Sequence, residues 1–266
     1  MKKVYSVKDI EELHRGGGLE SIPSNAVITP SARDRLNELD VKLVKRSGGH
    51  VSATTSKNNG ALDENGIDQS VRANSSKTDI ERLFNSPAVH ELKEQICDVG
   101  RRLWQRAYVD GNGGNLSIRL TEDVVLCTPT LVSKGFMKPE DLCLVDLEGN
   151  QLAGIKNRTS EILMHLSIMK AQPKARAVSH AHPPYATGFA VAGVQPPTCM
   201  IPEIEVFIGR VPIAPYETPG TPEMGLKVAE LVDQHNTVLM ENHGVVSWSN
   251  TIEAVSYTHL MLPTKA

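Results

Sequence analysis

The spacing of apolar residues predicts a long amphipathic helix that begins near residue 86. Ser86 and Pro87 are typical of a helix start, in which a serine cap is followed by proline in the first turn. The apolar residues that follow recur at helical spacing and form one stripe, Leu92, Ile96, Val99 and Leu103. A stripe of this kind is the face that a helix buries against a core.

Shorter segments alternate between apolar and polar residues, or are continuously apolar, as strands are. They predict strands at 115–120, 124–127, 143–147, 177–180 and 238–240. Glu148-Gly149-Asn150 is typical of a hairpin turn after the third of these strands. Helical patterns at 160–171 and from Thr221 onward separate the later strands. The alternation of helices and strands indicates the α/β class.

Changes in composition divide the chain into three zones. Residues 1–45 contain two short helical patterns, at 7–13 and 32–36, and are interpreted as a helical leader. Residues 46–77 are rich in Ser, Gly, Asn, Asp and Lys, and they bury too little apolar surface to offset the entropy of ordering, which predicts a disordered linker. A globular domain is expected at 78–266.

Charge and cysteine content narrow the class of protein. The chain has 266 residues and a net charge of −3, so it offers no electrostatic case for binding nucleic acid or an anionic membrane. It shows neither an apolar run of membrane-span length nor the apolar core of a signal peptide. The four cysteines lack CxxC spacing and are interpreted as reduced thiols, which makes the cytoplasm the expected compartment.

Two histidine motifs suggest a metal site. His180 and His182 are two residues apart at the end of a predicted strand, so their side chains point to the same side. His243 follows another predicted strand and would complete three nitrogen ligands. Sites with three protein ligands and one open position usually perform chemistry, whereas closed sites with four ligands are structural.

Glu161 is the second candidate for chemistry. It lies in the first turn of a predicted helix, where Thr159 or Ser160 would be the cap. A carboxylate near a metal suits a general base, and the helix start suits an anion, but a glutamate at this position taken alone more often completes a capping arrangement. His165, four residues later, is expected to support or pack against the site rather than bind the metal.

Taken together, an ordered set of motifs resembles the class II aldolase/adducin family. The resemblance runs from about Leu92 to Ala254 and rests on Gly114-Asn115, Thr128-Pro129-Thr130, Thr159-Ser160-Glu161, His180-Ala181-His182-Pro183, Pro215-Tyr216 and Asn242-His243-Gly244. It implies a three-layer α/β/α fold with a central, mainly antiparallel sheet, and a homotetramer with sites at subunit interfaces. It also implies Zn²⁺ or a similar divalent ion on His180, His182 and His243.

The match to the branch that is similar to L-fuculose-phosphate aldolase implies roles for the other residues. Those expected to hold the substrate phosphate are Gly114, Asn115, Thr130, Thr159 and Ser160. Glu161 would move the proton on the carbon of dihydroxyacetone phosphate, and Tyr216 of a neighbouring subunit would protonate the aldehyde oxygen. The implied reaction is the cleavage of L-fuculose or L-rhamnulose 1-phosphate to dihydroxyacetone phosphate and lactaldehyde.

Two positions depart from the family pattern. Leu131 stands where many members have glycine, so a differently shaped phosphate loop, or a substrate without phosphate, is expected. After Val255 the amphipathic pattern of a long C-terminal helix is not continued, and Pro263 would break it. The C-terminus is therefore expected to be truncated.

Other functions remain open on the same residues. A pentulose-phosphate 4-epimerase, a decarboxylase or a dehydratase would use the same fold, although Glu161 rather than aspartate favours the aldolase. An adducin-like scaffold would have no need of the three histidines and Glu161. The leader is similar to segments that dock enzymes to a bacterial microcompartment shell, but an inert extension would show the same short patterns.

Overall fold

The computed structural model describes residues 4–5, 7–15, 22, 27–28, 62–63, 65–198 and 202–261. The chain divides into two compact units, Met1–Lys57 and Asn58–Ala266. In the smaller unit, helix α1 (Val7–Arg15) accompanies a parallel pair of two-residue strands, β1 (Val4–Tyr5) and β2 (Val27–Ile28). The helix predicted at 7–13 is therefore present, and the one predicted at 32–36 lies outside the described residues.

A single large sheet forms the centre of the described part of the larger unit. Its eight strands have the order β6-β5-β4-β3-β7-β10-β9-β8. The strands are β3 (Asn115–Arg119), β4 (Val124–Cys127), β5 (Cys143–Asp146), β6 (Gln151–Ala153), β7 (Ala177–Ala181), β8 (Ile213–Ala214), β9 (Thr237–Met240) and β10 (Gly244–Ser249). Every neighbouring pair is antiparallel except β8 with β9, which confirms a mainly antiparallel sheet.

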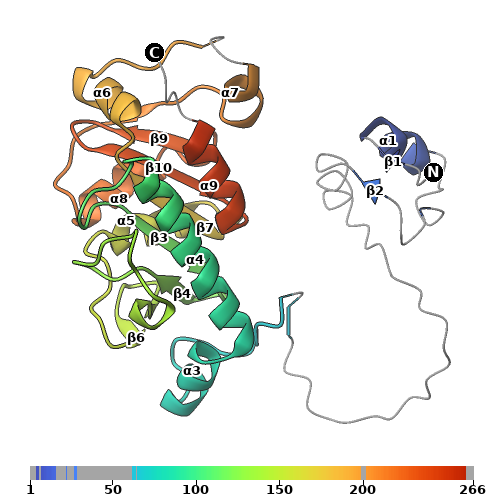
Figure 1. Ribbon diagram of the computed structural model, residues 1–266, viewed down its shortest axis with the longest axis vertical. Helices are drawn as coiled ribbons and strands as arrows, with labels where there is room; N and C mark the ends of the chain where they lie inside the picture. The colour runs from blue at the N-terminus through green and yellow to red at the C-terminus, as the bar shows by residue number, and fades with distance from the viewer. Residues whose placement is uncertain are drawn as a thin grey trace. The chain divides into compact units, whose positions relative to one another are not determined.

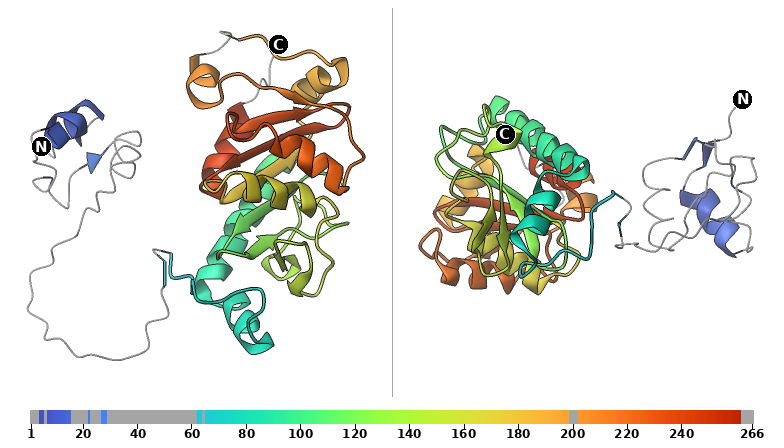
Figure 2. Two further views of the ribbon diagram at one scale, coloured as in Figure 1. Left: turned by 180° about the vertical axis from the view of Figure 1, so that it is seen from behind. Right: turned by 90° about the horizontal axis from the view of Figure 1, so that it is seen from below.

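Helices cover both faces of this sheet. They are α3 (Lys77–Phe84), α4 (Pro87–Gln105), α5 (Ile162–Ala171), α6 (Pro184–Ala192), α7 (Pro202–Phe207), α8 (Pro222–Ala229) and α9 (Ile252–Met261), with a 3-10 turn, η2, at Pro139–Asp141. Figure 1 shows α4 and α9 across the near face, and Figure 2 shows the yellow helix α5 on the opposite face. The three-layer arrangement expected from the sequence is confirmed.

Alternate residues of the central strands enter two separate hydrophobic cores. In β4, Leu126 packs in the core beneath α4 and α9, whereas Val125 packs in the core beneath α5 and α8. All four β4 residues are therefore buried. A strand that is covered on both faces has no polar side to display, which explains why the 124–127 segment alternates poorly in sequence.

The domain begins earlier than the sequence predicts. Ile67 and Val71 are buried in the core beneath α4, and the Gln69 side chain donates to Leu120 O at 2.8 Å. The predicted linker, 46–77, is therefore wrong at its C-terminal end, while residues 46–61 lie outside the described residues. Two apolar side chains are too few for composition to predict an ordered segment. They are enough to hold the segment in place when they pack against a core that the rest of the domain forms.

A helix continues past the expected end of the amphipathic pattern at Val255, while the expected truncation of the C-terminus stays a prediction. Helix α9 continues to Met261, six residues beyond the expected end of the pattern at Val255. Ser256 is fully buried and Thr258 is nearly so, beside the buried apolar residues Ile252 and Val255, so the buried side of α9 is mixed rather than a purely apolar stripe. Strand β10 was not predicted either. Among the described residues, no helix combines the length and the apolar character of a membrane span.

Candidate functional site

Three neighbouring strands in the middle of the sheet bring the site residues side by side at one end of the strands. Asn115, the first residue of β3, pairs with His180 near the end of β7, and His180 in turn pairs with Val246 of β10. His182 follows β7 directly. The antiparallel pairing therefore places residues far apart in the sequence beside one another.

His243 is positioned by a tight turn between β9 and β10. The turn holds Glu241, Asn242 and His243, and Asn242 has the left-handed φ of 54° that asparagine tolerates better than most residues. Gly244 then lets the chain pass close to β7, because a Cβ there would lie 2.5 Å from His182 Cδ2 and 2.8 Å from Ala181 O. The left-handed turn at Asn242 and the close approach at Gly244 thus direct the side chain of His243 toward the other two histidines.

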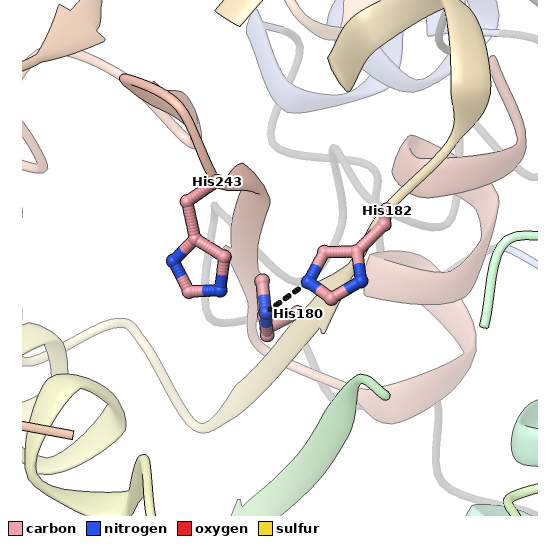
Figure 3. Close-up of side chains that lie close together, drawn as sticks. All are labelled: His180, His182 and His243. Carbon is pink, nitrogen blue, oxygen red and sulfur yellow. Dashed lines mark hydrogen bonds between the residues drawn. The ribbon is translucent and has the colours of Figure 1, made fainter. Parts of the chain in front are cut away.

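The three imidazoles face a common point (Figure 3). One ring nitrogen from each of His180, His182 and His243 lies within 4.8 Å of the other two. The Nε2 atoms of His180 and His182 are 3.0 Å apart. In a tetrahedral zinc site with Zn–N bonds of about 2.0–2.1 Å, ligand nitrogens lie about 3.3 Å from one another. The separations therefore fit one small divalent cation.

Burial keeps these histidines neutral. It is the largest cause that lowers the pKa of all three rings, His180 most strongly. His180 Nδ1 lies 2.8 Å from Val245 O, and a carbonyl only accepts, so Nδ1 carries the proton and Nε2 presents a lone pair. Neutral imidazole with a free nitrogen is the form that binds metals.

Glu161 lies directly against this cluster. It occupies the N-cap position of α5 but makes no side-chain capping bond, so the capping role is not the one that the structure shows. Its Oε2 is 3.5 Å from His180 Nε2, and its Oε1 is 3.3 Å from His243 Nε2. Glu161 Oε1 and His243 Nδ1 are buried without hydrogen-bond partners among the described residues. Ring nitrogens and carboxylate oxygens gathered around one point form a donor set that a cation between them would stabilise.

The residues predicted to hold phosphate are spread over two paired segments and a glycine loop. Thr130 N donates to Asn157 O, and Thr159 N donates to Thr128 O, so segments 128–130 and 157–159 lie side by side. Gly114 has a left-handed φ of 70°, and a Cβ there would lie 2.8 Å from His180 O. Ser160 is exposed beside Glu161. Both ends of the Asn115 amide are bonded, to Glu161 and to His165.

Tyr216 stands apart from this arrangement within one chain. Its backbone N–H donates to Glu241 Oε2 at 3.0 Å, which ties its loop to the turn that carries His243. The Tyr216 side chain is 51% exposed. No contact between the phenol and the three histidines occurs among the residues that the structure describes.

Sequence reasoning missed two charged residues near the site. Asp110 accepts hydrogen bonds from Gly113 N at 2.7 Å and Asn112 N at 3.3 Å, and the bond from Gly113 is the main cause that lowers its pKa. Lys134 is 1% exposed and donates to Val132 O and Asn112 O. The aspartate could have been found, because Asp-x-x-Gly is typical of such a turn, whereas the buried lysine left no sequence signal.

Comparisons with known proteins agree on one family. Residues 94–264 match the family model described as Class II Aldolase and Adducin N-terminal domain. The 3-oxo-tetronate 4-phosphate decarboxylase of Cupriavidus necator is 33% identical over 171 residues, 63% of this chain and 78% of the relative. The L-fuculose phosphate aldolase of Methanococcus vannielii is 36% identical over 166 residues, 61% and 86% of the two chains. The crystal structure of L-fuculose-1-phosphate aldolase from Thermus thermophilus superposes with a TM-score of 0.57 at 26% identity, covering 63% and 86%.

Proposed function

This chain belongs to the class II aldolase/adducin family, and from that premise we propose that it is a metal-dependent lyase of a phosphorylated sugar. The proposed reaction is the cleavage of a ketose 1-phosphate of the L-fuculose or L-rhamnulose type to dihydroxyacetone phosphate and lactaldehyde. One observation carries the proposal: three neutral imidazoles and one largely buried carboxylate face the same point.

His180, His182 and His243 would hold the divalent ion, which leaves a coordination position for substrate. A bound ion of this kind acts as a Lewis acid that stabilises negative charge developing on substrate oxygens. The donor set does not select the metal, because three imidazoles suit Zn²⁺, Co²⁺, Mn²⁺ and Fe²⁺ to different degrees.

Glu161 would carry the proton in this reaction. In the cleavage direction, Tyr216 of a neighbouring subunit takes up the proton of the C4 hydroxyl, C4 becomes the aldehyde carbon and the bond between C3 and C4 breaks. The electron pair of that bond remains on the three-carbon fragment as an enediolate. Glu161 then delivers a proton to that carbon, which gives dihydroxyacetone phosphate. The phosphate would lie against Gly114, Thr130, Thr159 and Ser160, whose backbone N–H groups and hydroxyls suit an anion.

Decarboxylation of a 3-oxo acid 4-phosphate is the second candidate, favoured by the 33% identity to the decarboxylase. Loss of CO₂ from 3-oxo-tetronate 4-phosphate breaks the bond between C1 and C2 and leaves the electron pair on C2. The resulting three-carbon fragment is the same enediolate, and its protonation again gives dihydroxyacetone phosphate. The two candidates therefore share the step assigned to Glu161 and differ only in the group that leaves.

The shared step can be tested without knowing the leaving group. The metal-loaded protein is expected to exchange one C–H of dihydroxyacetone phosphate for deuterium in heavy water, which proton NMR follows directly. Glu161→Gln should reduce this exchange by at least about 100-fold, and Glu91→Gln, on the exposed face of α4, should leave it unchanged. Normal exchange in Glu161→Gln would remove Glu161 from the mechanism.

Product analysis then separates the candidates. Fuculose 1-phosphate, rhamnulose 1-phosphate, ribulose 5-phosphate and 3-oxo-tetronate 4-phosphate are each incubated with and without chelator. Lactaldehyde identifies the aldolase, CO₂ the decarboxylase, and an epimerised pentulose the epimerase. A protein that binds no metal and turns over none of these compounds would support the scaffold instead.

We further propose a homotetramer and a docking role for the leader. A half-exposed Tyr216 suits a homotetramer in which the side chain from one subunit completes its neighbour's site. There it would accept the C4 hydroxyl proton during cleavage and return it to the aldehyde oxygen in the reverse condensation. Helix α1 of the leader is amphipathic, which suits docking to a partner groove such as that of a microcompartment shell.

A further inference from the structure

A chain of short hydrogen bonds leads away from Glu161 into the core. Asn115 Nδ2 lies 2.6 Å from Glu161 Oε2, and Asn115 Oδ1 lies 2.6 Å from His165 Nε2. On the other side of the ring, His165 Nδ1 lies 2.7 Å from Ser117 Oγ. The four residues form one continuous line that ends in fully buried groups, since both Ser117 and His165 are 0% exposed.

The direction of every hydrogen bond in this line is determined. A carboxylate only accepts, so the Asn115 amide must present Nδ2 to Glu161 and Oδ1 to His165. His165 Nε2 must then carry a proton and donate it to Oδ1. The opposite nitrogen, Nδ1, accepts from the Ser117 hydroxyl. Burial lowers the pKa of His165 to about 3, which is consistent with a neutral ring that has one donor and one acceptor.

The secondary structure holds this line rigidly. Asn115 and Ser117 are two residues apart on β3 and point to the same face, while Glu161 and His165 are four residues apart at the start of α5. The ring of His165, on the helix, therefore hydrogen-bonds to both Ser117 and Asn115 on the strand, and Asn115 in turn hydrogen-bonds to the Glu161 carboxylate. Nothing in this line depends on the exposed loops of the site.

We propose that His165 is a positioning residue that fixes the Asn115 amide, and through it the Glu161 carboxylate, in the orientation required for proton transfer. The inference rests on the proposed function, because it assigns a role within that reaction. It also gives Asn115 a role different from the phosphate contact expected from the sequence. A misplacement of about 1 Å can cost about 100-fold in rate, so a residue that never touches substrate can still control turnover.

Two amide substitutions that differ in length test the hydrogen bond made by His165 Nε2. His165→Gln places an amide N–H near the position of Nε2 and preserves the bond to Asn115, whereas His165→Asn reaches only the position of Nδ1 and loses it. We expect His165→Asn to lower kcat for deuterium exchange about 100-fold and His165→Gln to lower it no more than about 10-fold. KM and bound metal should stay near the wild-type values in both variants. Equal losses in the two variants, or a loss confined to KM, would overturn the proposal.

Two readouts do not require activity. Long-range ¹H–¹⁵N NMR should show wild-type His165 as the neutral Nε2–H tautomer, and crystal structures should show the Glu161 carboxylate displaced in His165→Asn but retained in His165→Gln. An Nδ1–H tautomer, or an unmoved carboxylate in His165→Asn, would refute the positioning role. If the wild-type protein shows no exchange activity, the proposed function is refuted instead. The NMR and crystallographic measurements would still test whether His165 positions Asn115 and Glu161.

Discussion

At the scale of single residues, Leu131 shows how the fold accommodates a departure from the family pattern. It adopts a left-handed φ of 56°, the conformation that glycine reaches without strain, and its side chain is 79% exposed. The backbone of the loop after Thr130 is therefore turned as a glycine would turn it. The strain is carried by a leucine whose side chain gains little burial in return.

Leu131→Gly is expected to stabilise the protein. Relief of the left-handed strain outweighs the greater chain entropy of glycine, and the free energy of unfolding should rise by about 0.5–1 kcal/mol. Urea unfolding measures this change. Leu226→Gly is the matched control, because Leu226 is also exposed but lies in helix α8, where glycine should cost about 1 kcal/mol. A loss of stability in Leu131→Gly would contradict the strain argument.

Lys134 makes stability depend on pH. Burial lowers its pKa from 10.5 to about 8, so between these values the unfolded chain binds more protons than the folded chain. The free energy of unfolding contributed by this group therefore rises as pH increases through that window. From about pH 7.5 to about pH 9.5 the wild type should gain about 1–2 kcal/mol relative to Lys134→Met. Urea unfolding of the two proteins at several pH values measures this difference. If the free energy of unfolding changes with pH by the same amount in both, the pKa of Lys134 is not lowered in the folded protein.

At the scale of elements, the sequence predicted most of the sheet but not the connections that build the site. The capping residues at the start of α4 and the continuous apolar segment of β4 are local signals, so the predicted start of α4 and the predicted bounds of β4 agree closely with the structure. Strand β10 was missed because it follows His243 directly, without the polar spacer that usually separates two strands. The line from Glu161 to Ser117 could not be predicted, because it joins side chains 44 positions apart that only the packing of α5 on β3 brings together.

The turn between β9 and β10 makes a prediction about metal affinity. In Gly244→Ala, the added methyl would press on His182 Cδ2 and Ala181 O, both fixed by the strands around them. Displacement of one imidazole should weaken metal binding about 10–100-fold, as measured by competition with a chromophoric chelator. Gly188→Ala, whose methyl meets nothing within 4 Å, is the control and should keep the wild-type affinity. Unchanged metal affinity in Gly244→Ala would show that the close approach of residue 244 to His182 and Ala181 does not determine the positions of the metal-binding imidazoles.

At the scale of the whole molecule, the chain divides into two compact units, and the hydrophobic clusters of the described residues all lie in the larger one. The larger unit contains the eight-stranded sheet, its three hydrophobic clusters and every residue assigned to chemistry. A unit with its own core is expected to fold by itself. The fragment 58–266 should therefore keep the exchange activity and the melting temperature of the full chain within about 2 °C. A fragment that is insoluble or inactive would show that the leader stabilises the domain.

The central claim is that His180, His182 and His243 bind one divalent ion beside Glu161. Elemental analysis of purified, metal-reconstituted protein tests it most directly. The account predicts about one equivalent of divalent metal per chain, lost in His180→Ala and retained in His90→Ala, whose imidazole lies on the exposed face of α4. A wild-type chain that retains no metal, or a His180→Ala variant that binds it as tightly as the wild type, would contradict the claim.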